Sequence, residues 1–229
     1  MDKISNPSFQ FWLGVREELP ILLGVIPFGM IYGISALSAG LKPAEAQAMS
    51  SIVFAGSAQF MTVELIKSVT PALVLVVTGM VINLRHALYS ASITPYIQHL
   101  PLRWKAALAY LLTDEAFAVS IINFQREGDQ NFRHWHLLGS GLALWTSWQI
   151  STAVGIFLGA QIPSGWGLDF ALPLTFIALV APGIKDRPGL ITAVIAGLIA
   201  LVFFKLPFSL YILLAAFFGI TAGLLSEKK

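Results

Sequence analysis

The sequence predicts an all-α protein, a polytopic transmembrane helical bundle of about seven or eight spans. Of its 229 residues, 56% are hydrophobic and only 11% are charged, whereas a soluble domain carries about twice that charged fraction. Mean hydropathy is +0.77. Long apolar runs such as 71–84 and 191–204 show no alternation of polar and apolar residues, which excludes a transmembrane β-barrel. We expect one integral membrane domain over residues 1–229.

Polar breaks divide the chain into eight apolar runs. The first begins after polar residues 1–18, and the second is the most polar of the set. The expected spans are 19–39, 45–66, 70–95, 104–124, 136–160, 169–184, 188–204 and 207–225.

Basic residues in the loops predict the orientation, because cytoplasmic loops are enriched in Lys and Arg. With eight spans, the side that holds both termini carries nine of them and the opposite side carries four. We therefore expect a multi-pass protein of a bacterial inner membrane with both termini in the cytoplasm. An alternative has seven spans, with 45–66 entering and leaving on one side as a re-entrant hairpin.

Two spans look interrupted. The first contains Pro20 and Pro27 beside Gly29, and the sixth is short and contains Pro173 and Pro182. Proline removes a backbone hydrogen bond and can unwind a helix, and paired interrupted spans in two halves of a chain indicate a transporter's binding site. Ordinary kinked packing helices are the alternative.

Charged residues occur in the middle of two spans. Asn83, Arg85 and His86 lie near the midpoint of 70–95, and Asp114 and Glu115 lie near the midpoint of 104–124. A lone charge at this depth is costly, so we expect Arg85 to pair with one of the two carboxylates. The pair either fixes helix register or belongs to a polar pathway or proton relay.

A patch of small residues with one amide, Gly56 to Gln59, precedes Phe60 in the second span. Such a patch allows close helix packing, or it lines a cavity. Trp145 and Trp148 are expected to pack between helices, with a substrate-facing wall as the alternative. No nucleotide-binding, hydrolase or metalloprotease motif is found, so we expect no enzyme, no cofactor and no metal site.

Four segments carry a family pattern: LPILLGVIPFGMIYG (19–33), FAGSAQF (54–60), INLRHALYSASITPY (82–96) and LLTDEAFAV (111–119). In this order and spacing the chain resembles the AzlC family of branched-chain amino-acid permeases. The resemblance implies a permease subunit that exports Leu, Ile, Val or similar amino acids and works with a small AzlD-type membrane subunit, without nucleic acid.

With that function, a zwitterionic amino acid needs a partner for each of its charges. The unwound backbone expected near Pro27, Phe28 and Gly29, or else Arg85, would hold the carboxylate, and Asp114 or Glu115 would hold the ammonium group or exchange a proton. Proton exchange would drive export. The other expected binding residues are Gly56, Ser57, Gln59, Phe60, Asn83, His86 and Phe117. A passive channel and a structural or assembly subunit remain the alternatives.

Overall fold

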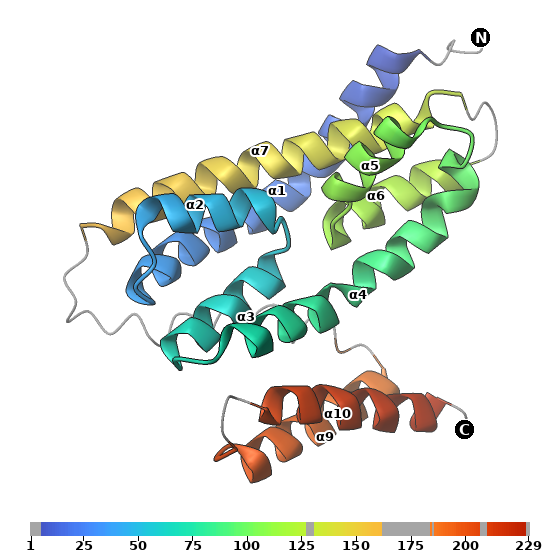
Figure 1. Cartoon of the computed structure of the whole chain (residues 1–229). Helices are drawn as coiled ribbons and strands as arrows, with labels where there is room; N and C mark the ends of the chain where they lie inside the picture. The colour runs from blue at the N-terminus through green and yellow to red at the C-terminus, as the bar shows by residue number, and fades with distance from the viewer. Residues whose placement is uncertain (1–5, 127–130, 162–183, 185, 207–209, 228–229) are drawn as a thin grey trace.

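Every regular element in the described part of the chain is an α-helix, which confirms the predicted fold class (Figure 1). The computed structural model describes residues 6–126, 131–161, 184, 186–206 and 210–227. Its helices are α1 (Pro7–Ser38), α2 (Pro43–Ile52), α3 (Gly56–Lys67), α4 (Ala72–Ile97), α5 (Leu102–Leu111), α6 (Asp114–Gln125), α7 (Arg133–Gly159), α9 (Arg187–Phe203) and α10 (Tyr211–Glu227).

Three of the described helices, α1, α4 and α7, are long and apolar enough to cross a membrane. They contain 32, 26 and 27 residues, and at about 1.5 Å per residue each exceeds the roughly 30 Å of a bilayer's apolar core. Asn6 is the N-cap residue of α1, and its side chain accepts a hydrogen bond of 2.7 Å from the Phe9 amide.

Helices α1 and α7 run in the same direction and touch along their length (Figure 1). Glycines set how close they come. A Cβ atom at Gly139 would lie 2.1 Å from the Phe11 carbonyl oxygen, and one at Gly155 would lie 2.1 Å from the Met30 oxygen. Two backbones in such contact form a close pair, as small residues allow between membrane helices.

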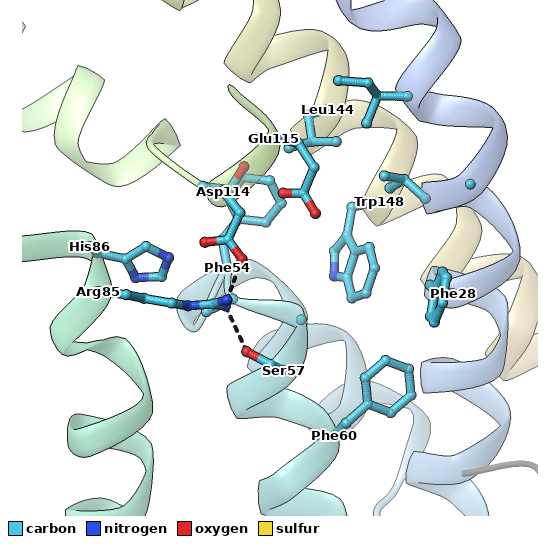
Figure 2. A pocket seen from close by; sticks show the side chains of 16 residues that line it. Phe28, Phe54, Ser57, Phe60, Arg85, His86, Asp114, Glu115, Leu144 and Trp148 are labelled. Carbon is cyan, nitrogen blue, oxygen red and sulfur yellow. Dashed lines mark hydrogen bonds and ion pairs between the residues drawn. The ribbon is translucent and has the colours of Figure 1, made fainter. Parts of the chain in front are cut away.

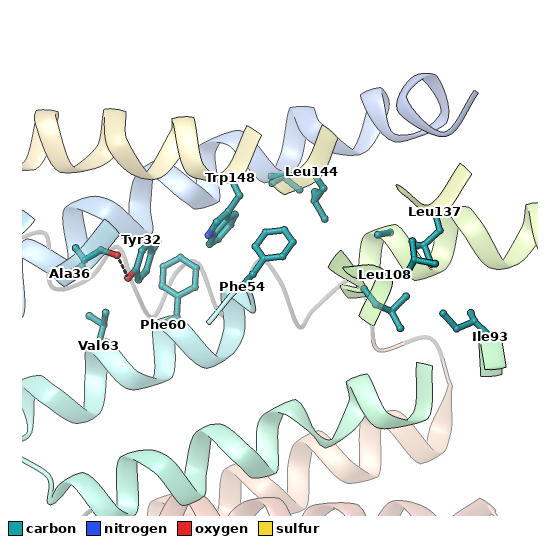
Figure 3. Packing of buried hydrophobic residues seen from close by; sticks show 14 of the residues in the cluster. Tyr32, Ala36, Phe54, Phe60, Val63, Ile93, Leu108, Leu137, Leu144 and Trp148 are labelled. Atoms are coloured by element: carbon teal, nitrogen blue, oxygen red, sulfur yellow. Dashed lines mark hydrogen bonds between the residues drawn. The ribbon is translucent and has the colours of Figure 1, made fainter. Parts of the chain in front are cut away.

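The second expected span, 45–66, is not one helix. It breaks at Val53–Ala55 into α2 and α3. The start of α2 is fixed to the C-terminal half of α1, because the Tyr32 hydroxyl donates a hydrogen bond of 2.9 Å to the Ala46 carbonyl. Figure 3 shows Val63 of α3 at this same end. The segment is therefore a hairpin that returns to the end from which it came, as the seven-span alternative had it.

The fourth expected span, 104–124, also breaks, at Leu112 and Thr113, into α5 and α6. Near the start of α5, Trp104 packs edge-on against Trp135 of α7, with ring centroids 5.0 Å apart. Just past the end of α6, Arg126 pairs with Glu17 of α1 at 3.3 Å. This hairpin therefore begins and ends at the N-terminal ends of α1 and α7, opposite to the α2–α3 hairpin.

The interruption expected in the first span is wrong, because α1 continues through Pro20 and Pro27. Proline inside a membrane helix is tolerated where neighbouring helices and local adjustments satisfy the freed carbonyl, and here the packing of Gly29 against Trp148 and Ser151 of α7 holds the helix in place. The expected sixth span, 169–184, lies outside the described residues except for position 184.

The last two expected spans correspond to α9 and α10, which pack against each other. Asp186 begins α9, its carboxylate accepting a 2.7 Å hydrogen bond from the Gly189 amide. A Cβ atom at Gly219 of α10 would lie 2.9 Å from the Ala196 Cβ of α9, so this pair is also in close contact.

Replacing Gly139 with Ala should separate α1 from α7, because the added methyl group meets a backbone oxygen that cannot move alone. We expect a loss of about 1–3 kcal/mol in stability, measured as a lower melting temperature in detergent. Gly197→Ala is the matched control, because its Cβ meets no described atom within 4 Å. Equal melting temperatures for the two variants would contradict the close contact.

The hairpins also predict which loops share a side of the membrane. The chain has no Cys, so single cysteines can be labelled without background. Cysteines at Lys42 and Ser68 should react with an impermeant maleimide from one side, and cysteines at Arg103 and Gln125 from the other. Eight full crossings would instead place Lys42 and Ser68 on opposite sides.

Candidate functional site

A cavity of about 250 Å³ lies where the two hairpin breaks meet. It is at mid-height in the frame of long helices, because Arg85 is at the middle of α4 and Leu144 and Trp148 flank the middle of α7. The lining residues are Ile21, Gly24, Val25, Phe28, Phe54, Ala55, Gly56, Ser57, Phe60, Arg85, His86, Thr113, Asp114, Glu115, Leu144 and Trp148.

The Arg85 guanidinium connects both hairpins across one wall of this cavity (Figure 2). One terminal nitrogen forms an ion pair with Asp114 at the start of α6, and the other donates a hydrogen bond of 2.6 Å to the Ser57 hydroxyl in α3. The side chains of Arg85 and Asp114 are 30% and 36% exposed, toward the cavity rather than sealed in the core. The ion pair predicted for Arg85 is thus present, with Asp114 as its partner.

The break at 53–55 places the N-terminus of α3 at the cavity. Its N-cap residue, Ala55, has no side chain that can accept from the first-turn amides, and free amides at a helix N-terminus attract negative charge. Gly56 faces Trp148, whose ring would lie 3.1 Å from an added Cβ. This end of the cavity is therefore positive, from the helix end and from Arg85.

The break at 112–113 places the N-terminus of α6 at the cavity too, but this helix end carries two carboxylates. Thr113 caps it, its hydroxyl accepting a hydrogen bond of 3.4 Å from the Ala116 amide, and Asp114 and Glu115 fill the first turn. Acidic residues in the first turn interact favourably with the helix dipole. With Asp114 bound to Arg85, Glu115 remains as a second carboxylate on the cavity wall (Figure 2).

Aromatic and aliphatic side chains form the rest of the wall. Phe28 of α1, Phe60 of α3 and Trp148 of α7 face the cavity opposite the charged groups (Figure 2). Trp148 is held in place because its indole nitrogen donates a 3.1 Å hydrogen bond to the Gln59 amide oxygen and its ring stacks on Tyr32. An apolar surface therefore faces a charged one across the cavity.

Eight of the predicted site residues line the cavity: Phe28, Gly56, Ser57, Phe60, Arg85, His86, Asp114 and Glu115. Five others lie outside its lining. Gly29 packs against α7, Gln59 supports Trp148, Phe117 stacks on Tyr89, Asn83 lines a separate groove between α2, α3 and α4, and Pro27 is exposed.

Sequence reasoning missed several lining residues. Phe54, Ala55 and Thr113 belong to the two breaks, and Leu144 lies on α7, four residues before Trp148, for which a substrate-facing wall was the alternative expectation. The polar character of the second span was a signal for the first break. A Thr followed by two acidic residues, a common pattern at helix starts, was a signal for the second.

These features define a class: a helical membrane protein with a small, internal, oppositely charged cavity between two broken segments. The description "AzlC protein" is that of the family model that matches residues 20–162, which is more than half of the chain. The chain belongs to the AzlC family.

Relatives of the chain are membrane and transport proteins. It is 29% identical to the inner membrane protein YgaZ of Escherichia coli, over 96% of this chain and 90% of that protein. It is 32% identical to an uncharacterized membrane protein of Archaeoglobus fulgidus, over 86% of each. It is 28% identical to the branched-chain amino acid transport protein AzlC of Bacillus subtilis, over 76% of this chain and 69% of that protein. No solved structure matches the chain.

Arg85→Gln should destabilise the protein, because Asp114 would lose its only salt-bridge partner among the described residues. We expect a loss of about 1–2 kcal/mol, below the roughly 3–5 kcal/mol of a sealed pair, since both side chains are about one third exposed. The double variant Arg85→Gln/Asp114→Asn should recover part of this loss, measured by thermal unfolding in detergent.

The matched control is the exposed pair Lys42–Glu45, whose atoms are 3.9 Å apart. Lys42→Gln should leave the melting temperature unchanged, because surface pairs contribute little. Additive effects of the Arg85 and Asp114 substitutions would show that the two side chains are not coupled.

Proposed function

We propose that this protein is the large subunit of a secondary transporter that exports branched-chain amino acids, Leu, Ile or Val, across the inner membrane in exchange for protons. The observation that carries the proposal is the cavity, which offers positive charge, negative charge and apolar surface in one small space. A free amino acid with an apolar side chain presents these same three features.

The substrate carboxylate is assigned to the N-terminus of α3 and to Arg85. Free backbone amides and a guanidinium both bind carboxylates well. Two buried polar atoms on this side, Arg85 Nε and His86 Nε2, have no hydrogen-bond partner among the described residues. The assignment to Pro27–Gly29 is dropped, because α1 is continuous there and has no free helix end.

The substrate ammonium group is assigned to Glu115 with Asp114. Both carboxylates lie on the cavity wall, and Asp114 is already bound to Arg85. Glu115 has no ion-pair partner among the described residues, so its charge is available to a cation. A substrate that bridges Arg85 and Glu115 would bring two opposite charges to the places where the cavity offers their complements.

The apolar side chain of the substrate is assigned to the wall formed by Phe28, Phe60 and Trp148. The cavity volume of about 250 Å³ is below the roughly 300–1,000 Å³ of pockets for drug-sized ligands, which suits a small metabolite. The name of the Bacillus subtilis relative supports branched-chain amino acids as the class.

The orientation proposed is N-terminus in the cytoplasm. Between residues 6 and 161, the end where α1 and α7 begin holds five basic residues: Arg16, Arg103, Lys105, Arg126 and Arg133. The opposite end holds two, Lys42 and Lys67. Because the hairpins do not cross the membrane, Arg103 and Lys105 lie on the side opposite to the one expected from eight crossings. The basic residues still favour a cytoplasmic N-terminus.

Proton exchange is the proposed driving force, with Glu115 the first candidate for the exchanging group because Asp114 is already paired with Arg85. A small AzlD-type subunit is the proposed partner, from the family resemblance. The proposed chemistry is transport without a covalent step, so no catalytic residue is assigned.

Leucine counterflow tests the substrate assignment. Proteoliposomes that contain the chain with its small partner should take up labelled leucine against unlabelled leucine inside. Leucinamide, which lacks the carboxylate, should compete about 10–100-fold less well than leucine, because it cannot form the charge-assisted hydrogen bonds to Arg85.

Arg85→Lys should weaken leucine binding and reduce the difference in competition between leucine and leucinamide. The reason is that a lysine cannot form the paired hydrogen bonds that a guanidinium makes with a carboxylate. Lys105→Gln, in the first turn of α5 and outside the cavity lining, is the control and should behave as the unaltered protein. Equal competition by leucine and leucinamide would remove Arg85 and the α3 N-terminus from the site, and unsaturable leucine flux would indicate a passive channel.

A further inference from the structure

A carboxyl group that the substrate site does not use lies between α1 and α7. The Glu18 side chain is fully buried, at 0% exposure. One carboxyl oxygen accepts a hydrogen bond of 2.6 Å from the Ser140 hydroxyl, and the other, also buried, has no hydrogen-bond partner among the described residues. One neutral donor is little compensation for a buried carboxylate, which usually needs a cation or several donors.

Glu18 lies one helical turn from the cavity. One face of α7 carries His136, Ser140, Leu144 and Trp148 at intervals of four residues, and the last two line the cavity. Ser140, which binds Glu18, is thus about 6 Å along the helix axis from Leu144. Glu18 also interacts electrostatically with Glu115 on the cavity wall.

A chain of polar contacts continues from this level to the surface. The His136 ring, one turn before Ser140, bonds through Nε2 to Glu17 at 3.0 Å and through Nδ1 to Ser120 at 3.4 Å. Glu17 in turn pairs with Arg126 at 3.3 Å, and the Arg126 side chain is 51% exposed. Titratable groups therefore follow one another from the cavity to the end of the bundle where α1 begins, with Glu18 and His136 buried and Glu17 half-buried.

We propose that Glu18 relays protons between Glu115 in the cavity and the His136–Glu17 pair at the end of the bundle. The inference rests on the proposed proton-coupled transport. Glu115, protonated from the cavity, gives its proton through one bridging water to the Glu18 carboxylate. Protonated Glu18 passes the proton to the neutral His136 imidazole, and the resulting imidazolium releases it to solvent at Glu17, which is the cytoplasmic end in the proposed orientation. Each cycle moves one proton inward, as export in exchange for protons requires, and leaves all three groups as they began.

The charged groups around Glu18 favour such a role. Glu115 of α6 interacts with it electrostatically, and Glu17 precedes it in α1. On α7, His136 and Arg133 lie one and two turns before Ser140, which binds Glu18. The Arg133 guanidinium donates to the carbonyl oxygens of Asn123 and Phe124, at 2.9 and 2.8 Å. No ion pair joins Glu18 to a cation among the described residues, so no fixed positive charge holds it ionised.

A structural role for Glu18, as a hydrogen-bond acceptor that locks α1 to α7, gives a different prediction. Gln at this position keeps the size of the side chain and can accept the Ser140 hydrogen bond, but it cannot carry a proton. Glu18→Gln should therefore keep its thermal stability and leucine counterflow, while leucine transport driven by an imposed pH gradient falls about tenfold or more. Glu45→Gln, an exposed carboxylate 55% accessible on α2, is the matched control and should keep gradient-driven transport.

A second measurement does not depend on leucine. Infrared difference spectra of the purified complex between acid and alkaline pH should contain a protonated-carboxyl band. Glu18→Gln should remove it, and Ser140→Ala should shift its frequency because the hydrogen bond to the group is lost. If Glu18→Gln does not fold, the shift in Ser140→Ala identifies the band.

The outcomes distinguish the proton relay from the substrate assignment. Loss of gradient-driven transport together with loss of the band supports the relay. Full gradient-driven transport in Glu18→Gln, or a band that neither variant changes, overturns it. A protein that shows the Glu18 band but no leucine counterflow would refute the substrate assignment and still support a proton-carrying Glu18.

Discussion

The contact of Arg85 with both hairpins is the interaction on which the rest of the site depends. A guanidinium at the middle of a membrane helix is tolerated only where protein groups or water compensate its charge. Asp114 and Ser57 supply that compensation, and each belongs to the first turn of a short helix that begins at mid-height. The ion pair therefore depends on the α6 break and the hydrogen bond to Ser57 on the α3 break, because each break places its residue in the first turn of a helix at this depth.

The two helix N-termini that meet at Arg85 have the same kind of backbone geometry, but their first turns differ in side-chain charge. The α3 end has no acidic residue in its first turn, whereas the α6 end has Asp114 and Glu115. Irregular backbone at membrane depth is tolerated where it lines an internal cavity, and both breaks, at 53–55 and at 112–113, are of this kind. One end stays positive and the other becomes negative, so the cavity has a direction along which a zwitterion can align.

Part of this arrangement could be predicted from the sequence and part could not. Composition and run lengths are sufficient for a helical membrane protein, and the cost of a lone charge is sufficient to pair Arg85 with a neighbouring carboxylate. The positions of the breaks follow from tertiary contacts instead. Pro27 suggested a break, yet α1 stays continuous against α7. No proline or glycine occurs at Leu112 and Thr113, yet the chain turns there because Arg85 and the capping Thr113 stabilise a new helix start.

The same energetic reasoning applies to Glu18. The α1–α7 interface is made of backbone contacts at glycine, where an added methyl group would already collide with the opposite helix. An apolar side chain at position 18 would suit such an interface better than a carboxyl group with one hydroxyl donor, because buried polar groups that lack partners reduce stability. Leucine or methionine there would leave the Ser140 hydroxyl free to bond within its own helix. Packing alone therefore does not account for a carboxyl at this position, whereas the proposed path for protons between the cavity and the helix ends uses one.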